Sequence, residues 1–268
     1  MTTGTAPIRA GFHDVLLSEW TKLRTLQVTT VGLLGFVAAS AVMSFVLTSG
    51  AAEEYASLPP EDQLGVSSLT LSLYGLLIAQ LVIAVLGSMA MTSEYATGTI
   101  KTSVTAVPRR GRLLAAKAVV VSSLSFVAGI VAALGMVLVG QTSFNGRQVG
   151  AFTSLHLSDP EVVRAVLGAG LYMVLLGLLS LAVGTLVRWT AGAIVVLVCG
   201  VLIVPSMFES LPEGWSELLS FYWPTNAGLQ IVLSGPDGLA PWLGFGVMAA
   251  FTAVLLAVAY AVLRLRDV

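Results

Sequence analysis

Few residues of this 268-residue chain have the type and spacing that covalent chemistry needs. A nucleotide-binding P-loop requires a glycine directly before its lysine, whereas Lys22, Lys101 and Lys117 follow threonine, isoleucine and alanine. The two histidines, His13 and His156, are too far apart for the His-Glu-x-x-His motif of a metalloprotease. We therefore expect no catalytic residue, no metal site and no cofactor bound by this chain.

Polar residues within long apolar stretches are the next candidates, because transporters use buried ionisable groups as binding and relay sites. Lys117 is the only charged residue in these stretches, and it lies at the end of one of them. Gln80 is the most polar residue well inside a stretch. A glutamine at such a position is more typical of a hydrogen bond between helices, but an intramembrane binding site at Gln80 stays open.

The segment 10–26, AGFHDVLLSEWTKLRTL, gathers its apolar side chains on one face of a helix. This pattern predicts an amphipathic helix that lies in the membrane interface. Glu19 interrupts the apolar face, and its carboxylate either pairs with Lys22 one turn away or contacts a protein partner. The sequence favours neither of these two interpretations of Glu19 over the other.

A second polar segment, 93–116, contains a carboxylate, a glycine–threonine pair that can end a helix, and a basic cluster that follows a proline. Glycine permits the backbone conformation that ends a helix, and proline is favoured in the first turn of a new one. The residues concerned are Glu94, Gly98, Thr99, Pro108, Arg109 and Arg110. The preference of basic residues for the cytoplasmic side of a membrane explains the basic cluster by itself. It does not explain why the cluster follows a carboxylate and a turn.

The composition excludes a water-soluble domain, because only 10% of the residues are charged and 56% are hydrophobic, whereas soluble domains carry about 25% charged residues. Six charge-poor stretches approach or exceed the roughly 20 residues that cross a bilayer. They predict an all-α, polytopic membrane protein with six transmembrane helices. The predicted spans are about 27–48, 69–92, 117–140, 165–187, 191–208 and 241–263.

A seventh charge-free stretch, 218–236, contains Pro224, Pro236 and two side-chain amides. Broken backbone at membrane depth is tolerated only where protein covers it. We therefore predict that the extracellular segment 209–236 is re-entrant and does not cross the membrane.

The basic residues predict the orientation, because cytoplasmic loops carry an excess of lysine and arginine. With six spans, one side of the membrane receives all thirteen basic residues except Arg147 and Arg164. Both termini and the 93–116 loop lie on that side, which we interpret as the cytoplasm.

At these segments the sequence resembles the permease subunits of ABC-2 type ABC transporters. The resemblance rests on Ser18 to Leu23, on Glu94 to Ile100, and on Pro108 to Lys117, together with the six-helix layout. It implies that 94–112 forms a coupling helix that docks on a separate ATPase subunit, that 10–26 also touches that subunit, and that 209–236 forms re-entrant helices. By the same resemblance, Glu19, Lys22 and the residues of the second polar segment belong to the coupling surface.

The resemblance implies a permease subunit, mainly of exporters, that catalyses no covalent reaction and pairs with an identical or different second permease. ATP and magnesium would be bound by the partner ATPase, and the other contacts would be membrane lipids, with no nucleic acid. We expect the chain in a bacterial cytoplasmic membrane. The alternatives are an ATP-independent secondary transporter or channel, and a membrane scaffold that transports nothing.

Overall fold

The structure, a computed structural model, describes residues 11–25, 27–56, 68–106, 110–144, 159–233 and 238–265. Within these ranges the chain is helical and contains no strand. The helices are α1 (Phe12–Thr25), α2 (Gln27–Ala56), α3 (Ser68–Leu73), α4 (Leu76–Ala96), α5 (Ile100–Ala106), α6 (Arg110–Phe144), α7 (Pro160–Val187), α8 (Thr190–Val198), α9 (Val204–Ser206), α10 (Glu213–Tyr222), α11 (Pro224–Leu229) and α12 (Pro241–Leu265).

Five helical segments are long and apolar enough to cross a bilayer, so the chain is a multi-pass, all-α membrane protein, as predicted. These segments are Gln27–Ala51, Ser68–Ala96, Arg110–Thr142, Pro160–Val187 and Pro241–Leu265. A shorter apolar segment, Thr190–Ser206, contains α8, a π-helical stretch at Cys199–Ile203, and α9.

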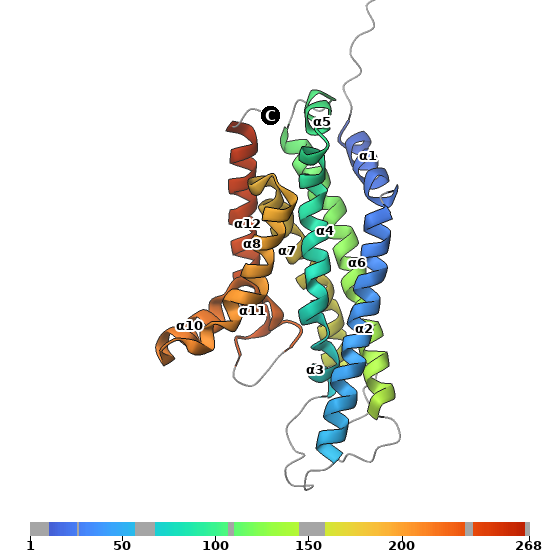
Figure 1. Cartoon of the computed structure of the whole chain (residues 1–268), viewed down its shortest axis with the longest axis vertical. Helices are drawn as coiled ribbons and strands as arrows, with labels where there is room; N and C mark the ends of the chain where they lie inside the picture. The colour runs from blue at the N-terminus through green and yellow to red at the C-terminus, as the bar shows by residue number, and fades with distance from the viewer. Residues whose placement is uncertain are drawn as a thin grey trace, which may run out of the picture.

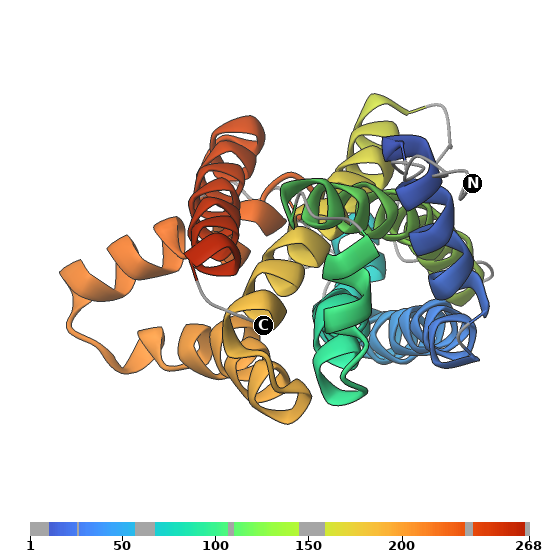
Figure 2. The ribbon, with the colours of Figure 1, turned by 90° about the horizontal axis from the view of Figure 1, so that it is seen from above.

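Helix α7 is the most buried of the five, and α4, α6 and α12 pack around it (Figures 1 and 2). Small residues allow the close approach of α4 and α7. A Cβ atom at Gly184 would lie 2.6 Å from the carbonyl oxygen of Ser88, and one at Gly87 would lie 2.7 Å from that of Gly177. Ser180, one turn before Gly184 on α7, belongs to this same internal α4–α7 contact.

The described part of the 93–116 segment is mostly helical and not an irregular loop. Helix α4 continues to Ala96, and α6 begins at Arg110 instead of near residue 117. The first turns of α6 bury Leu113, Leu114 and Ala116 against the rest of the chain. Charge-free stretches locate the apolar core of a span, whereas the hydrogen-bonded helix continues through basic residues into the interface.

The segment before the last helix folds as two short helices, α10 and α11, which meet at Trp223 and Pro224. Helix α11 packs against α12, while α10 projects away from the bundle (Figures 1 and 2). The indole nitrogen of Trp223 donates a hydrogen bond to the carbonyl oxygen of Gly200, at 2.8 Å. Neither short helix is long enough to cross a bilayer.

Helices α1 and α5 and the last turn of α12 lie at one end of the bundle, whereas α3 and the last turns of α2 lie at the other (Figure 1).

We predict that Gly184→Ala destabilises the protein by about 1–3 kcal/mol, because the added methyl group overpacks the α4–α7 contact. Gly135→Ala is the matched control. Its Cβ would meet no atom within 4 Å, and alanine favours helix by up to about 1 kcal/mol. Thermal unfolding of the detergent-solubilised protein measures both variants. Equal melting temperatures for the two would contradict the packing argument.

Candidate functional site

Four charged side chains from three helices form a network at the end of the bundle where α1 and α5 lie. Its centre is the ammonium group of Lys117, which donates to Glu19 Oε2 at 2.7 Å, to Glu94 Oε1 at 2.7 Å and to the carbonyl oxygen of Ala90 at 2.9 Å. The Lys117 side chain is only 3% exposed. All three donors of the ammonium group are therefore used.

Lys22 completes the network from its outer side. Its ammonium group lies 2.7 Å from Glu19 Oε1 and 2.9 Å from Glu94 Oε1, and its side chain is 43% exposed. Burial alone would lower the pKa of Lys22. The hydrogen bonds and charges of Glu19 and Glu94 outweigh burial and raise that pKa above its ordinary value. Two carboxylates thus meet two ammonium groups, and the network is neutral overall.

Helix geometry explains how residues far apart in the sequence meet here. Glu19 and Lys22 lie one turn apart on α1, Glu94 lies in the last turn of α4, and Lys117 lies in the third turn of α6. Apolar contacts beneath the charges hold α1 in place, and its buried Val15 belongs to the same apolar cluster as side chains of α4 and α6. The network therefore joins α1 to both α4 and α6.

Both glutamates face the interior of the chain. Glu19 does pair with Lys22, as one of the two readings predicted, but it also binds Lys117. Sequence reasoning missed this second pair because 98 residues separate its members; the only signal was that Lys117 is the sole charge in a predicted span. The carboxylate of Glu94 is likewise buried, and its Oε2 atom has no hydrogen-bond partner.

Beyond Glu94 the chain turns sharply and enters α5. Gly98 has a φ of +71°, a conformation that glycine adopts without strain, and the hydroxyl groups of Thr97 and Thr99 lie 2.8 Å apart. Gly98 and Thr99 thus end α4, as predicted. In α5, Ile100 is buried, whereas Lys101 and its neighbour Thr102 are exposed. Helix α5 therefore presents a polar surface close to the network.

The basic cluster that follows α5 is described only in part, because Pro108 and Arg109 lie outside the described residues. Arg110 donates a hydrogen bond to the carbonyl oxygen of Leu263, at 2.7 Å. This contact joins the start of α6 to the last turn of α12, so the guanidinium group of Arg110 is engaged within the chain.

A sequence profile described as "ABC-2 family transporter protein" matches residues 15–204. The chain belongs to the ABC-2 transporter family. The matched range runs from α1 to the start of α9, so it contains the whole charged network and α5. No protein in a curated set matches the chain.

Gln80, the polar candidate inside the ABC-2 transporter bundle, is buried between helices. Its side-chain oxygen accepts a hydrogen bond from the hydroxyl group of Tyr172 on α7, and its nitrogen donates to the carbonyl oxygen of Leu77 at 2.8 Å. These bonds favour the interhelical interpretation over a substrate ligand. Gln80 adds a polar link to the close contact of α4 and α7.

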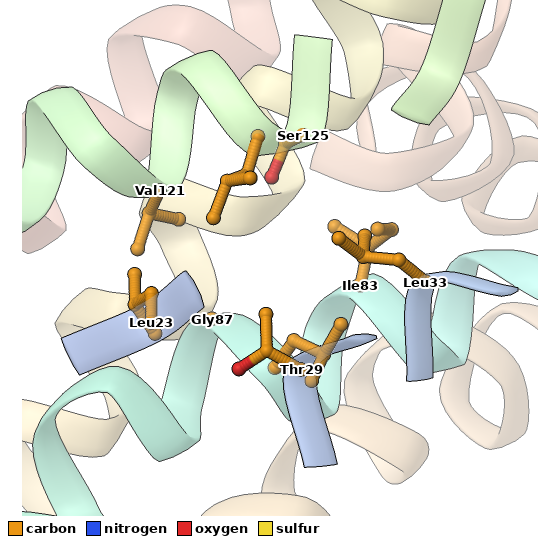
Figure 3. Close-up of a pocket in the computed structure, with 9 residues that line it drawn as sticks. Leu23, Thr29, Leu33, Ile83, Gly87, Val121 and Ser125 are labelled. Atoms are coloured by element: carbon orange, nitrogen blue, oxygen red, sulfur yellow. The ribbon is translucent and has the colours of Figure 1, made fainter. Parts of the chain in front are cut away.

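A cavity of about 20 Å³ lies near the charged network, between α1, α2, α4 and α6. Figure 3 labels residues that line it, among them Leu23 of α1, Thr29 of α2 and Val121 of α6. The cavity holds about one water molecule, so it is not a route for cargo.

A larger hollow of about 280 Å³ lies between α7, α8, α11 and α12. Apolar side chains such as Leu179, Val196 and Phe251 form most of its lining, and Thr225 contributes a hydroxyl group. A lining of this kind suits hydrocarbon better than a hydrated ion.

We predict that Lys117→Met destabilises the protein by about 3–5 kcal/mol, because it leaves two buried carboxylates with only Lys22 between them. Adding Glu19→Gln to this variant removes one of the uncompensated charges and should recover part of the loss. Lys101→Met is the matched control, since Lys101 is exposed and surface changes usually stay within about 0.5 kcal/mol. Thermal unfolding in detergent checks the series. A Lys117→Met protein as stable as the Lys101→Met protein would contradict the role of the network.

Proposed function

We propose that this chain is the membrane-spanning subunit of an ATP-driven exporter, and that α1, α4, α5 and α6 receive the motion of a separate ATPase subunit. Membership of the ABC-2 transporter family supports the transport role. The observation that carries the coupling role is the buried network of Glu19, Lys22, Glu94 and Lys117, which joins three helices at the end of the bundle where α5 lies.

In this proposal α5 is the part that meets the ATPase. It is short, its exposed face carries Lys101, Thr102 and Thr105, and only the turn at Gly98 separates it from α4. A push on α5 therefore reaches Glu94 through less than two helical turns of chain. Glu94 acts as a positioning residue, because its carboxylate contacts Lys22 and Lys117 and not the surface.

The proposed topology has six crossings, with both termini on the cytoplasmic side of a bacterial inner membrane. The five long helical segments would supply five crossings, and the shorter apolar segment Thr190–Ser206 would supply the remaining one. This segment rises about 25 Å at 1.5 Å per residue. A span somewhat shorter than the bilayer is accommodated by local thinning or by packing against neighbours. The location of α1, α5 and the end of α12 at one end of the bundle supports an even number of crossings.

The segment 209–236 would lie on the extracellular side. Trp215 and Tyr222 on α10 are exposed, and aromatic side chains of this kind favour the membrane–water interface. We propose that α10 rests in the outer interface and that α11 dips beside α12.

The complete transporter would contain a second permease subunit, identical or different, and ATP and magnesium would be bound by the ATPase subunits. An ATP-independent transporter or channel would need polar side chains along a path. Among the described residues the larger hollow is mostly apolar and Gln80 is engaged in hydrogen bonds between helices, so the ATP-driven reading is favoured.

We predict that Lys101→Glu weakens the binding of the ATPase subunit at least about tenfold, because a reversed charge at an interface opposes its partner. Arg264→Glu is the matched control. It makes the same charge change at the same end of the bundle, on α12 and away from α5. The measurement is co-purification with a candidate P-loop ATPase expressed together with the chain, and ATP hydrolysis by the complex. Equal losses in both variants would contradict docking at α5, and a wild-type chain that binds no ATPase would contradict the proposed function.

We predict that Thr102→Cys and Glu217→Cys report opposite sides of the membrane. In a Cys199→Ala background, an impermeant maleimide should label Glu217→Cys in intact cells and Thr102→Cys only after permeabilisation. Both positions are exposed in the isolated chain, so the difference would come from the membrane. Labelling of Thr102→Cys in sealed cells would overturn the orientation.

A further inference from the structure

Arg188, in the turn between α7 and α8, has an unusual backbone. Its φ is +62°, and it is the only residue other than glycine with a positive φ among the described residues. This left-handed conformation is strained for most residues other than glycine, asparagine and aspartate. An arginine at a position that suits glycine indicates that its side chain has a use.

The side chain of Arg188 leaves hydrogen-bond donors without partners. Its guanidinium carbon lies 5.2 Å from the centre of the Tyr95 ring. The Nε and Nη2 atoms of Arg188 and the hydroxyl group of Tyr95 are all buried, and none has a hydrogen-bond partner. Buried donors without partners are costly, so these three donors indicate that a ligand absent from the isolated chain satisfies them.

The surroundings define the charge of that ligand. The charges of Arg188, Arg110 and Glu94 all act on Tyr95, so two guanidinium groups and one carboxylate lie in its surroundings. The neighbouring carboxylate of Glu94 holds both ammonium groups of the charged network through its Oε1 atom, and that network is neutral. The junction is therefore positive, and its ligand is an anion.

The position of Arg188 points to the source of the anion. The next residue, Trp189, is 68% exposed, and the hydroxyl group of Thr190 donates to that of Thr92 at 3.0 Å, which holds the turn against α4. Both α4 and α7 end here as apolar spans. An exposed tryptophan at the end of a span is typical of the headgroup region, where basic pockets between helices bind anionic lipids.

We propose that Arg188 and Tyr95 form a phosphate-binding site for the headgroup of an anionic phospholipid. The planar guanidinium group can donate two parallel hydrogen bonds to one phosphate, and the Tyr95 hydroxyl group can donate another. On binding, the guanidinium group of Arg188 moves from the Tyr95 ring to the phosphate. Its Nε and Nη2 atoms, which have no hydrogen-bond partner in the isolated chain, then donate to the phosphate oxygens. This inference goes beyond the proposed function, because it requires a lipid and not an ATPase.

The test measures lipid binding to the purified full-length protein in detergent. Native mass spectrometry compares occupancy by dioleoyl phosphatidylglycerol with occupancy by dioleoyl phosphatidylcholine. Wild-type protein should prefer the anionic lipid, and Arg188→Gln should weaken this binding at least about tenfold, as expected for the loss of a charged hydrogen bond. Tyr95→Phe should weaken it less, because it removes one neutral donor.

Two further variants separate the site from simple charge and from folding. Arg112→Gln removes the same charge from an exposed position of α6 and should change binding by no more than about twofold. Arg188→Gly suits the left-handed turn, so it should be at least as heat-stable as the wild type and still lose the preference for the anionic lipid.

Three outcomes would overturn the proposal. The first is an equal loss of binding in Arg188→Gln and Arg112→Gln, and the second is equal binding of the two lipids by the wild type. The third is displacement of the anionic lipid by millimolar inorganic phosphate, which would make the site one for a free anion. Failure of any ATPase to bind the chain would leave these lipid measurements intact, so the two proposals can fail separately.

Discussion

The attachment of the first helix to the bundle depends on one buried ammonium group. Among the residues that the structure describes, only Lys117 touches both buried glutamates and a backbone carbonyl at once. Removing an ammonium group from water is expensive, and two carboxylates and a carbonyl at hydrogen-bond distance offset that cost. Without it, Glu19 would keep Lys22 as its partner, and the apolar contacts of α1 with α4 and α6 would have to offset a buried carboxylate that has lost one ion pair.

Helix α4 connects this network to the centre of the bundle. Near its end, Glu94 binds the lysines of α1 and α6; further along, Gly87 and Ser88 lie against the backbone of α7; deeper still, Gln80 accepts a hydrogen bond from Tyr172. Closely packed interiors transmit displacement because they leave no room to absorb it. A shift of α5 that moves α4 must therefore also move α7, which is the most buried span.

The sequence predicted the parts of the structure that depend on local patterns. Charge-free stretches found the long apolar helices, Gly98 marked the end of α4, and the prolines marked the segment that forms α10 and α11. The pairing of Glu19 with Lys22 was also local. The partner that buries Glu19 was not, because nothing in the pattern of α1 refers to a residue of α6. The left-handed turn at Arg188 gave no signal, since arginine is not typical of that conformation.

The two electrostatic features at this end of the bundle respond differently to ionic strength. The network of Glu19, Lys22, Glu94 and Lys117 is neutral and mostly buried, and buried pairs are screened much less than exposed ones. Lys101 on α5 is exposed, so any attraction it makes is screened by salt. The internal link from α1 to α4 and α6 should therefore persist under conditions that release a partner held by α5. The proposed coupling role requires this order of strengths, because the contacts that join α1, α4 and α6 must survive conditions that weaken a contact at α5.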